Sequence, residues 1–275
     1  MFFLKLCLNK MFNIYIAILN KMITFTKNNF KTKIDKMKTL PNEIEIQKIL
    51  EGDHLKIALS HDEIGDEHFS TGIETPLRAD AFDISDNEKI KRIEYHFREI
   101  METLGLDLED DSLKGTPHRV AKMYIKEIFN GLDPSNKPKI ALFENKYQYN
   151  QMLVEKDITF YSNCEHHFVP IFGKAHVAYI SNGKVIGLSK LNRIVDYFAR
   201  RPQVQERLTV QIGKELQKIL QTEDVAVVID AKHLCVSSRG VKDINSATVS
   251  SFYGGKFENE QTKSEFLNYL KSIGN

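Results

Sequence analysis

The chain has 275 residues, of which 42% are hydrophobic and 27% charged, a globular composition that excludes a disordered or fibrous chain. Residues 1–40 hold eight lysines against one aspartate, a net of +7 in a chain whose total is +1, which leaves −6 for the rest. This excludes a broad basic surface on the body, so no nucleic-acid partner is expected. Three cysteines do not make a disulfide framework, which favours a reducing, cytoplasmic compartment where thiols can bind metal.

The first 85 residues are predicted to be an N-terminal extension. Residues 1–26 interleave apolar and basic side chains, and no run approaches the roughly 20 apolar residues of a spanning helix, so no membrane partner is expected. Residues 1–37 are either a presequence or not translated, with the start at Met22 or Met37. Residues 39–86 are polar and irregular, which is typical of a flexible segment. One folded domain over residues 86–275 is predicted to follow.

Two helices are predicted at the start of this domain. Apolar residues recur at helical spacing over residues 90–104, and Gly105 is placed as a C-cap. Thr116 and Pro117 are an N-cap and a first-turn proline for a second helix, which ends at Gly131. These helices form the N-terminal helical segment of the domain.

Strands are predicted to follow the helices. Residues 151–162 alternate as one strand, and residues 174–180 form a second. Ser181-Asn-Gly-Lys184 separates the second strand from a short strand over residues 185–188. Asn-Gly between two apolar runs predicts a β-hairpin, so the core is expected to contain an antiparallel sheet.

Two further helices are predicted to meet at a proline corner. Ser189 is placed as the cap of the first, and Pro202 stops it and can stand in the first turn of the second. Apolar residues then recur every four positions over residues 204–220. Gln205 and Glu206 occupy the first turn of the second helix, where a carboxylate is favoured by the helix dipole. Capping is the plain interpretation of Glu206.

The last part of the domain returns to strands before a final helix. A β-rich run over residues 224–237 places His233 and Cys235 two positions apart, so both would project from one face of a strand. Another strand is predicted over residues 246–253, and Thr262-Lys-Ser-Glu265 has the pattern of a capping box. The order of helices, strands, helices and strands indicates an α+β fold.

Thiols and imidazoles are concentrated in two short segments. Cys164 and His167 have C-x-x-H spacing, which lets one turn present both to a single ion, and Cys235 can supply a third ligand. Three protein ligands plus a water is the catalytic zinc pattern, whereas His166 or His233 as a fourth ligand would close the site. In the open case these two histidines are the natural acid and base. Thiolate and imidazole donors favour Zn²⁺ over magnesium or calcium.

Other residues that carry charge or an imidazole are unremarkable one by one. His176 lies on an apolar strand outside both clusters and is expected to be a satisfied core histidine. Five cations on separate elements are typical of solvated surfaces, yet gathered round one pocket they would hold a polyphosphate. These cations are Arg119, Lys122, Lys190, Arg193 and Arg239.

Five segments between residues 88 and 273 carry a common signature. They are Gly115-Thr-Pro-His-Arg-Val-Ala-Lys-Met-Tyr124, Cys164-Glu-His-His-Phe-Val-Pro170, Gly187-Leu-Ser-Lys-Leu-Asn-Arg193, Arg201-Pro-Gln-Val-Gln-Glu-Arg-Leu208, and His233-Leu-Cys-Val236 with Ser238-Arg-Gly240. Together they closely resemble the signature segments of the GTP cyclohydrolase I family, and five motifs in register make coincidence implausible. Residues 1–80 lie outside the resemblance.

The resemblance implies an enzyme that converts GTP and water into 7,8-dihydroneopterin triphosphate and formate, the first step of folate, tetrahydrofolate or related pterin biosynthesis. It implies one Zn²⁺ per subunit, held by Cys164, His167 and Cys235, with the zinc-bound water attacking C8 of the guanine. It also implies the tunnelling fold, an antiparallel sheet with helices packed on one side. The family assembles as a toroidal homodecamer with active sites between subunits, so scattered residues can converge from neighbouring chains.

The resemblance also implies roles for the remaining site residues. His233 would protonate N7 as the imidazole ring of guanine opens, His166 would assist proton transfers near the zinc, and Ser189 would take part in the later ribose rearrangement. Gln205 and Glu206 match the guanine-recognising positions, where a carboxylate can accept from N1–H and the 2-amino group. The triphosphate-binding positions are matched by Arg119, Lys122, Lys190, Arg193 and Arg239.

Two other interpretations remain open. A pterin-handling or deazaguanine-handling enzyme of the same fold, without ring opening, should lack the complete zinc set together with His233, and here both are present. A non-catalytic, zinc-stabilised interaction protein has no use for Ser189, Glu206 and five matched cations. Ring opening of GTP is therefore the favoured prediction.

Overall fold

The structure is a computed structural model that describes residues 72–271. The predictions for residues 1–37, and for the extension up to residue 71, lie outside the described residues. Residues 72–85 contain no helix or strand. Within the described part, no helix has both the length and the apolar character needed to cross a membrane.

Two helices begin the described domain. Helix α3 (Asp86–Thr103) starts at an N-cap serine, Ser85, whose hydroxyl accepts from the backbone N–H of Glu88. Helix α4 (Thr116–Met123) packs against α3, and His118 and Glu94 join the two helices by a 2.9 Å hydrogen bond. The predicted pair of helices is confirmed.

Two details of the second helix differ from the prediction. Gly115 is the N-cap of α4, so Thr116 is already helical. A π-turn, η1 (Tyr124–Ile128), follows α4, and two short 3₁₀ turns, η2 (Asn130–Leu132) and η3 (Pro134–Asn136), come next. Gly131 lies against the end of the later helix α5 (Leu188–Ala199). An added Cβ would be only 2.0 Å from the Tyr197 carbonyl oxygen. Only glycine fits there.

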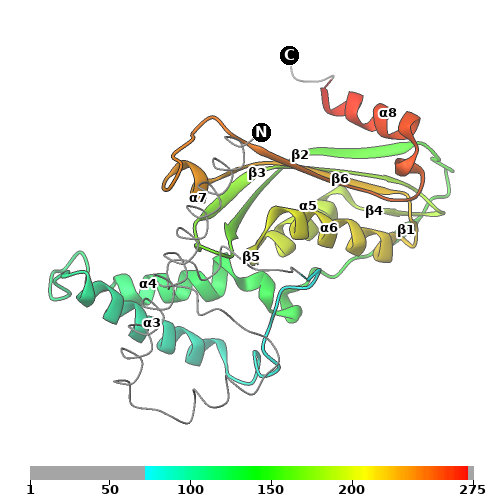
Figure 1. The fold of residues 1–275 in the computed structure, drawn as a ribbon. Helices are drawn as coiled ribbons and strands as arrows, with labels where there is room; N and C mark the ends of the chain where they lie inside the picture. Colours follow the sequence, from blue (N-terminus) through cyan, green and yellow to red (C-terminus); the bar gives the residue numbers. More distant parts are fainter. Residues whose placement is uncertain (1–71, 272–275) are drawn as a thin grey trace, which may run out of the picture. The chain divides into compact units, whose positions relative to one another are not determined.

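A five-stranded sheet forms the centre of the domain (Figure 1). Its strands are β5 (Pro202–Gln203), β2 (Met152–Cys164), β3 (Pro170–Ile180), β6 (Val225–His233) and β7 (Thr248–Tyr253), in that spatial order. All neighbours are antiparallel except the two-residue pairing of β2 with β5. The predicted α+β class and antiparallel sheet are confirmed.

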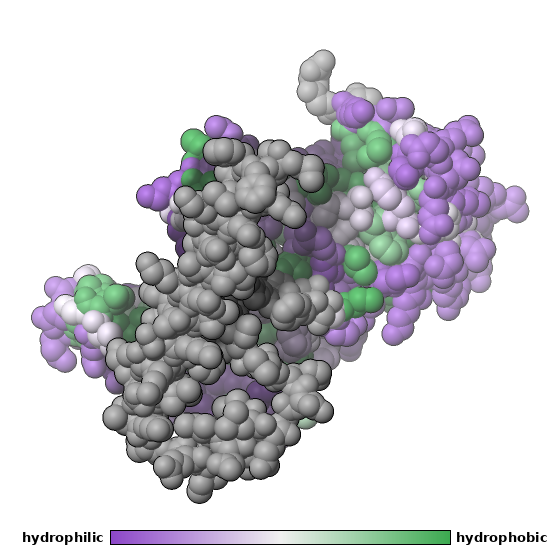
Figure 2. All heavy atoms as spheres, in the orientation of Figure 1, coloured by the Kyte–Doolittle hydropathy of each residue, from purple (hydrophilic) through white to green (hydrophobic). Residues whose placement is uncertain are grey.

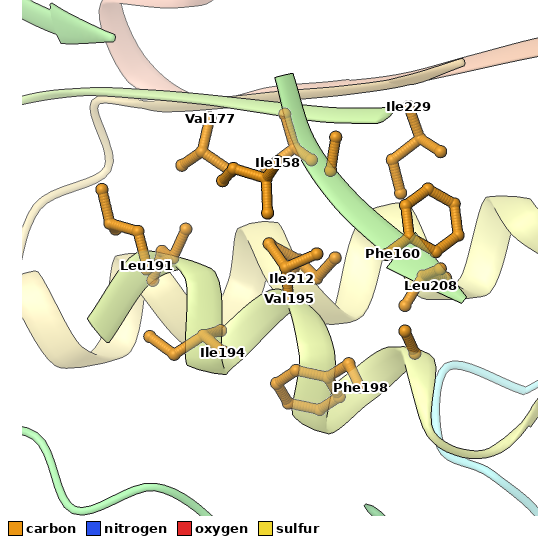
Figure 3. Close-up of a cluster of buried hydrophobic side chains, with 14 of the residues drawn as sticks. Ile158, Phe160, Val177, Leu191, Ile194, Val195, Phe198, Leu208, Ile212 and Ile229 are labelled. Carbon is orange, nitrogen blue, oxygen red and sulfur yellow. The ribbon is translucent and has the colours of Figure 1, made fainter. Parts of the chain in front are cut away.

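Helices α5 (Leu188–Ala199) and α6 (Gln205–Leu220) cover one face of the sheet and enclose the main core (Figures 1 and 3). Figure 3 shows Ile158, Phe160, Val177 and Ile229 of the sheet facing apolar side chains of the two helices. Each fully buried side chain of this size contributes about 1.5–3 kcal/mol relative to an exposed one. This core holds the ends of β2 and β6, where the cysteine and histidine segments begin.

The opposite face of the sheet is covered in part by α8 (Glu260–Lys271), preceded by a 3₁₀ turn, η4 (Gly255–Glu258). Phe257 and Phe266 pack there against Ala226 and Val228, which alternate along β6 with the residues that face α5 and α6. The expectation of helices on one side only is therefore wrong for α8. Side chains on opposite faces of β6 are both apolar, so each face needs a covering layer.

The predicted hairpin after Ile180 is also wrong. Strand β4 (Lys184–Ile186) pairs with β1 (Leu142–Glu144) in a separate two-stranded sheet. Strand β3 is bonded on one edge to β2 and on the other to β6, so it has no edge left for β4. The Asn-Gly pattern indicates a turn correctly, but the pairing depends on which strand edges are free.

Three predicted helix boundaries need correction as well. Gly187 is the N-cap of α5, so Ser189 lies inside the first turn, and Pro202 lies in β5 rather than in a helix. Helix α8 begins at Glu260, so Thr262 does not cap it. Asn259 takes that role, because its side-chain oxygen accepts from the backbone N–H two residues on.

Where residues 72–271 are visible in Figure 2, their surface is largely hydrophilic, with apolar side chains in smaller areas. Several large apolar side chains are exposed in the described residues, among them Ile100 of α3 and Leu104, the C-cap residue of α3, at 52% and 71%. They are one helical turn apart and therefore share a face of α3.

Candidate metal centre and its surroundings

A tight turn follows the last residue of β2 and presents two imidazoles. The backbone N–H of Cys164 donates to the Val169 carbonyl at 2.9 Å, and that of Phe168 donates to the Cys164 carbonyl at 2.8 Å. Phe168 has a left-handed φ of 55°. The Cys164 side chain is buried, while His166 and His167 are exposed. The turn thus holds the thiol in place and leaves the rings accessible.

Cys235 approaches from another element. Strand β6 ends at His233, and the next four residues form a short helix, α7 (Leu234–Ser237). The prediction that His233 and Cys235 share a strand face is therefore wrong, because the backbone changes conformation between them. The two side chains have separate surroundings as a result.

Three ligand atoms converge at this corner of the sheet. One ligand atom each of Cys164, His167 and Cys235 lies within 4.8 Å of the others, and Cys164 Sγ is 3.8 Å from His167 Nδ1. A tetrahedral zinc site with Zn–S bonds of about 2.3 Å separates its donor atoms by roughly 3.5–3.8 Å. Two thiols and an imidazole at these distances fit zinc in donor chemistry and in size.

Burial raises the pKa of the Cys235 thiol, and the neighbouring Cys164 raises it further. The thiol form is therefore favoured without an ion, and binding of a metal has to displace its proton. Metal affinity at this corner is expected to fall as the pH is lowered.

Distance from Cys164 does not separate the two adjacent histidines. His166 Nδ1 also lies 3.8 Å from Cys164 Sγ, and the two imidazole rings meet edge to face with centroids 6.4 Å apart. The convergent group within residues 72–271 nevertheless contains His167 and not His166.

The residue between Cys164 and His166 is held by a buried arginine. Both oxygens of the Glu165 carboxylate pair with the guanidinium of Arg207 on α6, one of them at 3.2 Å. Only 4% of the Arg207 side chain is exposed, and its Nε donates to the Gly72 carbonyl at 3.0 Å. This bidentate pair ties the ligand-bearing turn to α6. No sequence pattern predicted the Arg207–Glu165 pair. The only sign of it was an arginine within the segment 201–208.

His233 lies beside the metal group and is engaged elsewhere. Its Nε2 is 2.7 Å from Oε1 of Gln205, which is the first residue of α6. Burial lowers the pKa of His233, and the nearby Glu206 carboxylate opposes this shift. Gln205 and Glu206 do not cap α6, because Val204 is the N-cap and the N-terminus of α6 has no side-chain capping hydrogen bond.

Among the predicted cations, Arg239 lies at the metal group. Its Nη1 is 2.9 Å from His167 Nε2. Arginine can only donate, so in this arrangement the Nε2 atom of His167 is an acceptor. A neutral imidazole that binds metal through Nδ1 carries its proton on Nε2 and no longer accepts there. Metal binding through Nδ1 would therefore release the Arg239 guanidinium for another acceptor.

The other predicted site residues are distributed over α4, α5 and the first turn of α6. Arg119 bonds to the start of its own helix, with Nη2 at 2.8 Å from Thr116 Oγ1 and 3.1 Å from the Ser112 carbonyl. Within residues 72–271, the structure gives no hydrogen bond or ion pair between the cations of α4 and α5 and the metal group. Lys122, Ser189, Arg193 and Glu206 are exposed, and Lys190 is half-buried.

His176 is hydrogen-bonded as the sequence predicted, but it is half-buried and not in the core. Its Nδ1 accepts from the Asp157 N–H at 3.1 Å, where an irregularity between Glu155 and Ile158 interrupts the pairing of β2 with β3. Burial lowers its pKa. This histidine is a satisfied structural group, distant in role from the two clusters.

The fold and the site together define an α+β protein with a Cys-His-Cys group suited to zinc and a histidine positioned beside it. Residues 93–271 match the family model described as GTP cyclohydrolase I. The chain is 67% identical over 210 residues to the GTP cyclohydrolase 1 of Flavobacterium johnsoniae, covering 76% of this chain and 94% of that protein. The chain belongs to the GTP cyclohydrolase I family.

Other relatives give the same result. The GTP cyclohydrolase 1 of Aeromonas salmonicida is 58% identical over 201 residues, covering 73% of this chain and 91% of that protein. That of Vibrio parahaemolyticus is also 58% identical over 201 residues, covering 73% of this chain and 92% of that protein. All three names describe one enzyme.

Proposed function

We propose that the chain is the enzyme that converts GTP and water into 7,8-dihydroneopterin triphosphate and formate. The product feeds folate, tetrahydrofolate or related pterin biosynthesis, and the enzyme works in the cytoplasm. The family membership supports this activity. The observation that carries it is the convergence of Cys164, His167 and Cys235 within 4.8 Å, beside His233.

The proposed cofactor is one Zn²⁺ per subunit, held by Cys164, His167 and Cys235. When bound, zinc lowers the pKa of a water ligand from about 15.7 towards 7 and polarises oxygen groups of a substrate. The chain's own part is to hold two thiolates and a neutral imidazole at the end of a rigid sheet. The Arg207 pair with Glu165 fixes the turn from which two of these ligands come.

Proton transfers are assigned to the two remaining histidines. His233, half-buried, would give a proton to N7 of the guanine as its imidazole ring opens. His166, exposed at the metal-binding turn, would assist transfers nearby, and Ser189 would act in the later rearrangement of the ribose. Burial lowers the pKa of His233, so the ring can give up its proton readily near neutral pH.

Recognition of GTP is assigned to polar residues around this corner. The exposed Glu206 carboxylate would accept from N1–H and the 2-amino group of guanine, next to Gln205. Arg239, released from His167 as described above, is placed to meet a phosphate near the metal. The remaining triphosphate ligands are proposed to be Arg119, Lys122, Lys190 and Arg193.

We further propose that the site is completed by neighbouring subunits of a toroidal homodecamer of the tunnelling fold. Arg119 of α4 bonds to Thr116 and to the Ser112 carbonyl, and within residues 72–271 no hydrogen bond or ion pair joins it to the metal group of the same chain. The exposed apolar face of α3 at Ile100 and Leu104 also favours burial in an assembly.

The test is to incubate the full-length protein with GTP and to follow formate release and pterin absorbance. Activity should disappear when a chelator removes the metal and return when Zn²⁺ is added back. Turnover that persists in metal-free protein would contradict the zinc dependence. Zinc-loaded protein that yields no formate would contradict the proposed reaction itself.

A further inference from the structure

We propose that Gln205 is a positioning residue for His233: it holds the ring with its proton on Nε2 and leaves Nδ1 as the nitrogen that exchanges a proton with the substrate. The exchange with substrate rests on the proposed function. The position of the ring proton does not, because it can be measured without turnover.

The orientation of the Gln205 side-chain amide follows from its neighbours. Its Nε2 lies 3.1 Å from the Ile229 carbonyl and 2.9 Å from the Thr248 carbonyl. Both carbonyls can only accept, so the end of the amide that faces them must be the NH₂ group. The reverse orientation would bring three oxygens together in a buried place, at the cost of unsatisfied acceptors. Oε1 is therefore the atom that faces His233.

A chain of hydroxyl groups fixes the same orientation. Thr209 Oγ1 donates to the Gln205 backbone carbonyl at 2.8 Å, so its single proton is used. The 2.7 Å contact between Thr209 Oγ1 and Ser250 Oγ must then have Ser250 as the donor. Ser250 Oγ is left to accept from Gln205 Nε2 at 3.0 Å. The two amide protons of Gln205 are thus shared among three acceptors, all of which require the NH₂ group on this side.

The state of His233 follows from that of Gln205. An amide oxygen can only accept, and it lies 2.7 Å from His233 Nε2, so this nitrogen must carry a proton. In the neutral ring the second nitrogen, Nδ1, then has the free lone pair. Within residues 72–271, the His233 ring makes no other hydrogen bond that the structure gives. The neutral ring therefore has one defined tautomer, and only Nδ1 can gain or lose a proton without breaking the contact with Gln205.

The burial of Gln205 favours support of His233 over direct hydrogen bonding to guanine. Gln205 is 2% exposed, and both ends of its side chain are occupied. To bind a guanine, the side chain would have to give up hydrogen bonds to β6 and β7. Glu206, the next residue, is exposed and free of that constraint. We therefore place substrate contact at Glu206 and the support of His233 at Gln205.

The first measurement concerns the ring proton. Full-length, zinc-loaded protein labelled with ¹⁵N at histidine is studied by solid-state NMR without GTP, and His233 is assigned by comparison with His233→Asn. Above the pKa of the ring, Nε2 should be protonated and Nδ1 not. A protonated Nδ1 with a bare Nε2 overturns the inference, and this result does not depend on turnover.

The second measurement separates positioning from recognition. Gln205→Met keeps the volume and removes the acceptor. We expect kcat to fall by about 10- to 100-fold, as for loss of a group that orients a reactive histidine, with KM for GTP within about threefold. The His233 spectrum should then show both tautomers. A large rise in KM with kcat unchanged would instead mean that Gln205 binds guanine and would overturn the inference.

A matched control lies on the same helix. Gln217 is also a buried glutamine of α6, 8% exposed, and its Nε2 donates to the Glu223 carbonyl at 2.9 Å. Gln217→Met should leave the His233 tautomer, kcat and KM unchanged. If the wild type shows the Nε2–H tautomer but makes no pterin, the proposed reaction fails while the assignment of the ring stands.

Discussion

The metal corner (Cys164, His167 and Cys235) and the His233 corner (His233 and Gln205) lie side by side but are organised in different ways. At the metal corner two histidines are exposed, and a thiol with a raised pKa faces a second thiol. At the His233 corner the ring is tied to a buried amide whose every polar atom is satisfied. The comparison teaches that buried hydrogen bonds hold the His233 ring, whereas the turn with Cys164 and His167 is held through the Arg207–Glu165 pair and keeps its imidazoles exposed.

The largest expected effects come from two variants, one that changes the metal group and one that changes His233. Cys235→Ser should abolish stoichiometric zinc binding and lower product formation by about 1,000-fold or more, since a metal supplies several kcal/mol at the transition state. His233→Ala should keep the zinc and still lose about 10²- to 10⁴-fold in rate, the contribution of a general acid. Metal content per subunit and formate release measure the two effects.

This pair of variants is decisive for the assignment. Loss of zinc in His233→Ala would show that His233 is a metal ligand and therefore part of the metal group. Full metal content in Cys235→Ser would show that another residue supplies the third ligand.

An intermediate effect is expected where the scaffold supports the metal-binding turn. Arg207→Ala leaves the Glu165 carboxylate half-buried without its partner and should lower the free energy of unfolding by about 3–5 kcal/mol. Arg92→Ala is the matched control, because Arg92 pairs with Glu88 at 3.0 Å on the surface and should cost at most about 1 kcal/mol. Denaturant unfolding of the metal-free proteins measures both.

Equal losses of unfolding free energy in the two arginine variants would contradict the proposal that the Arg207–Glu165 pair stabilises the metal-binding turn. A large effect of Arg207→Ala that saturating zinc partly reverses would sharpen the comparison, because it would show the ion and the scaffold stabilising the same turn.

The smallest effect concerns a histidine outside both corners. Burial lowers the pKa of His176 below its usual 6.5, so the unfolded chain binds the extra proton first as the pH falls. The stability that this residue contributes is thus complete above pH 6.5 and is lost as the pH falls below it. His176→Gln should weaken the loss of stability between pH 7 and 5, seen in thermal midpoints. An unchanged pH dependence would assign the loss to other groups, such as His233.

Much of the fold could be predicted from the sequence because it depends on short spacing. Helical periodicity located α3 and α6, and alternation located β2. The hairpin prediction failed because a turn pattern says nothing about which strand edges remain free. The start of α5 at Leu188 and that of α8 at Glu260 were missed because several residues at each boundary can serve as caps.

The sequence by itself determined the metal group, since Cys164 and His167 lie within one turn and a second cysteine lies close to His233. The tertiary structure decided how these residues are supported. Gln205 meets His233 across 28 positions, and Arg207 meets Glu165 across 42. Such contacts arise only when α6 packs on the sheet, because a linear pattern encodes local geometry and not the partners that packing brings together.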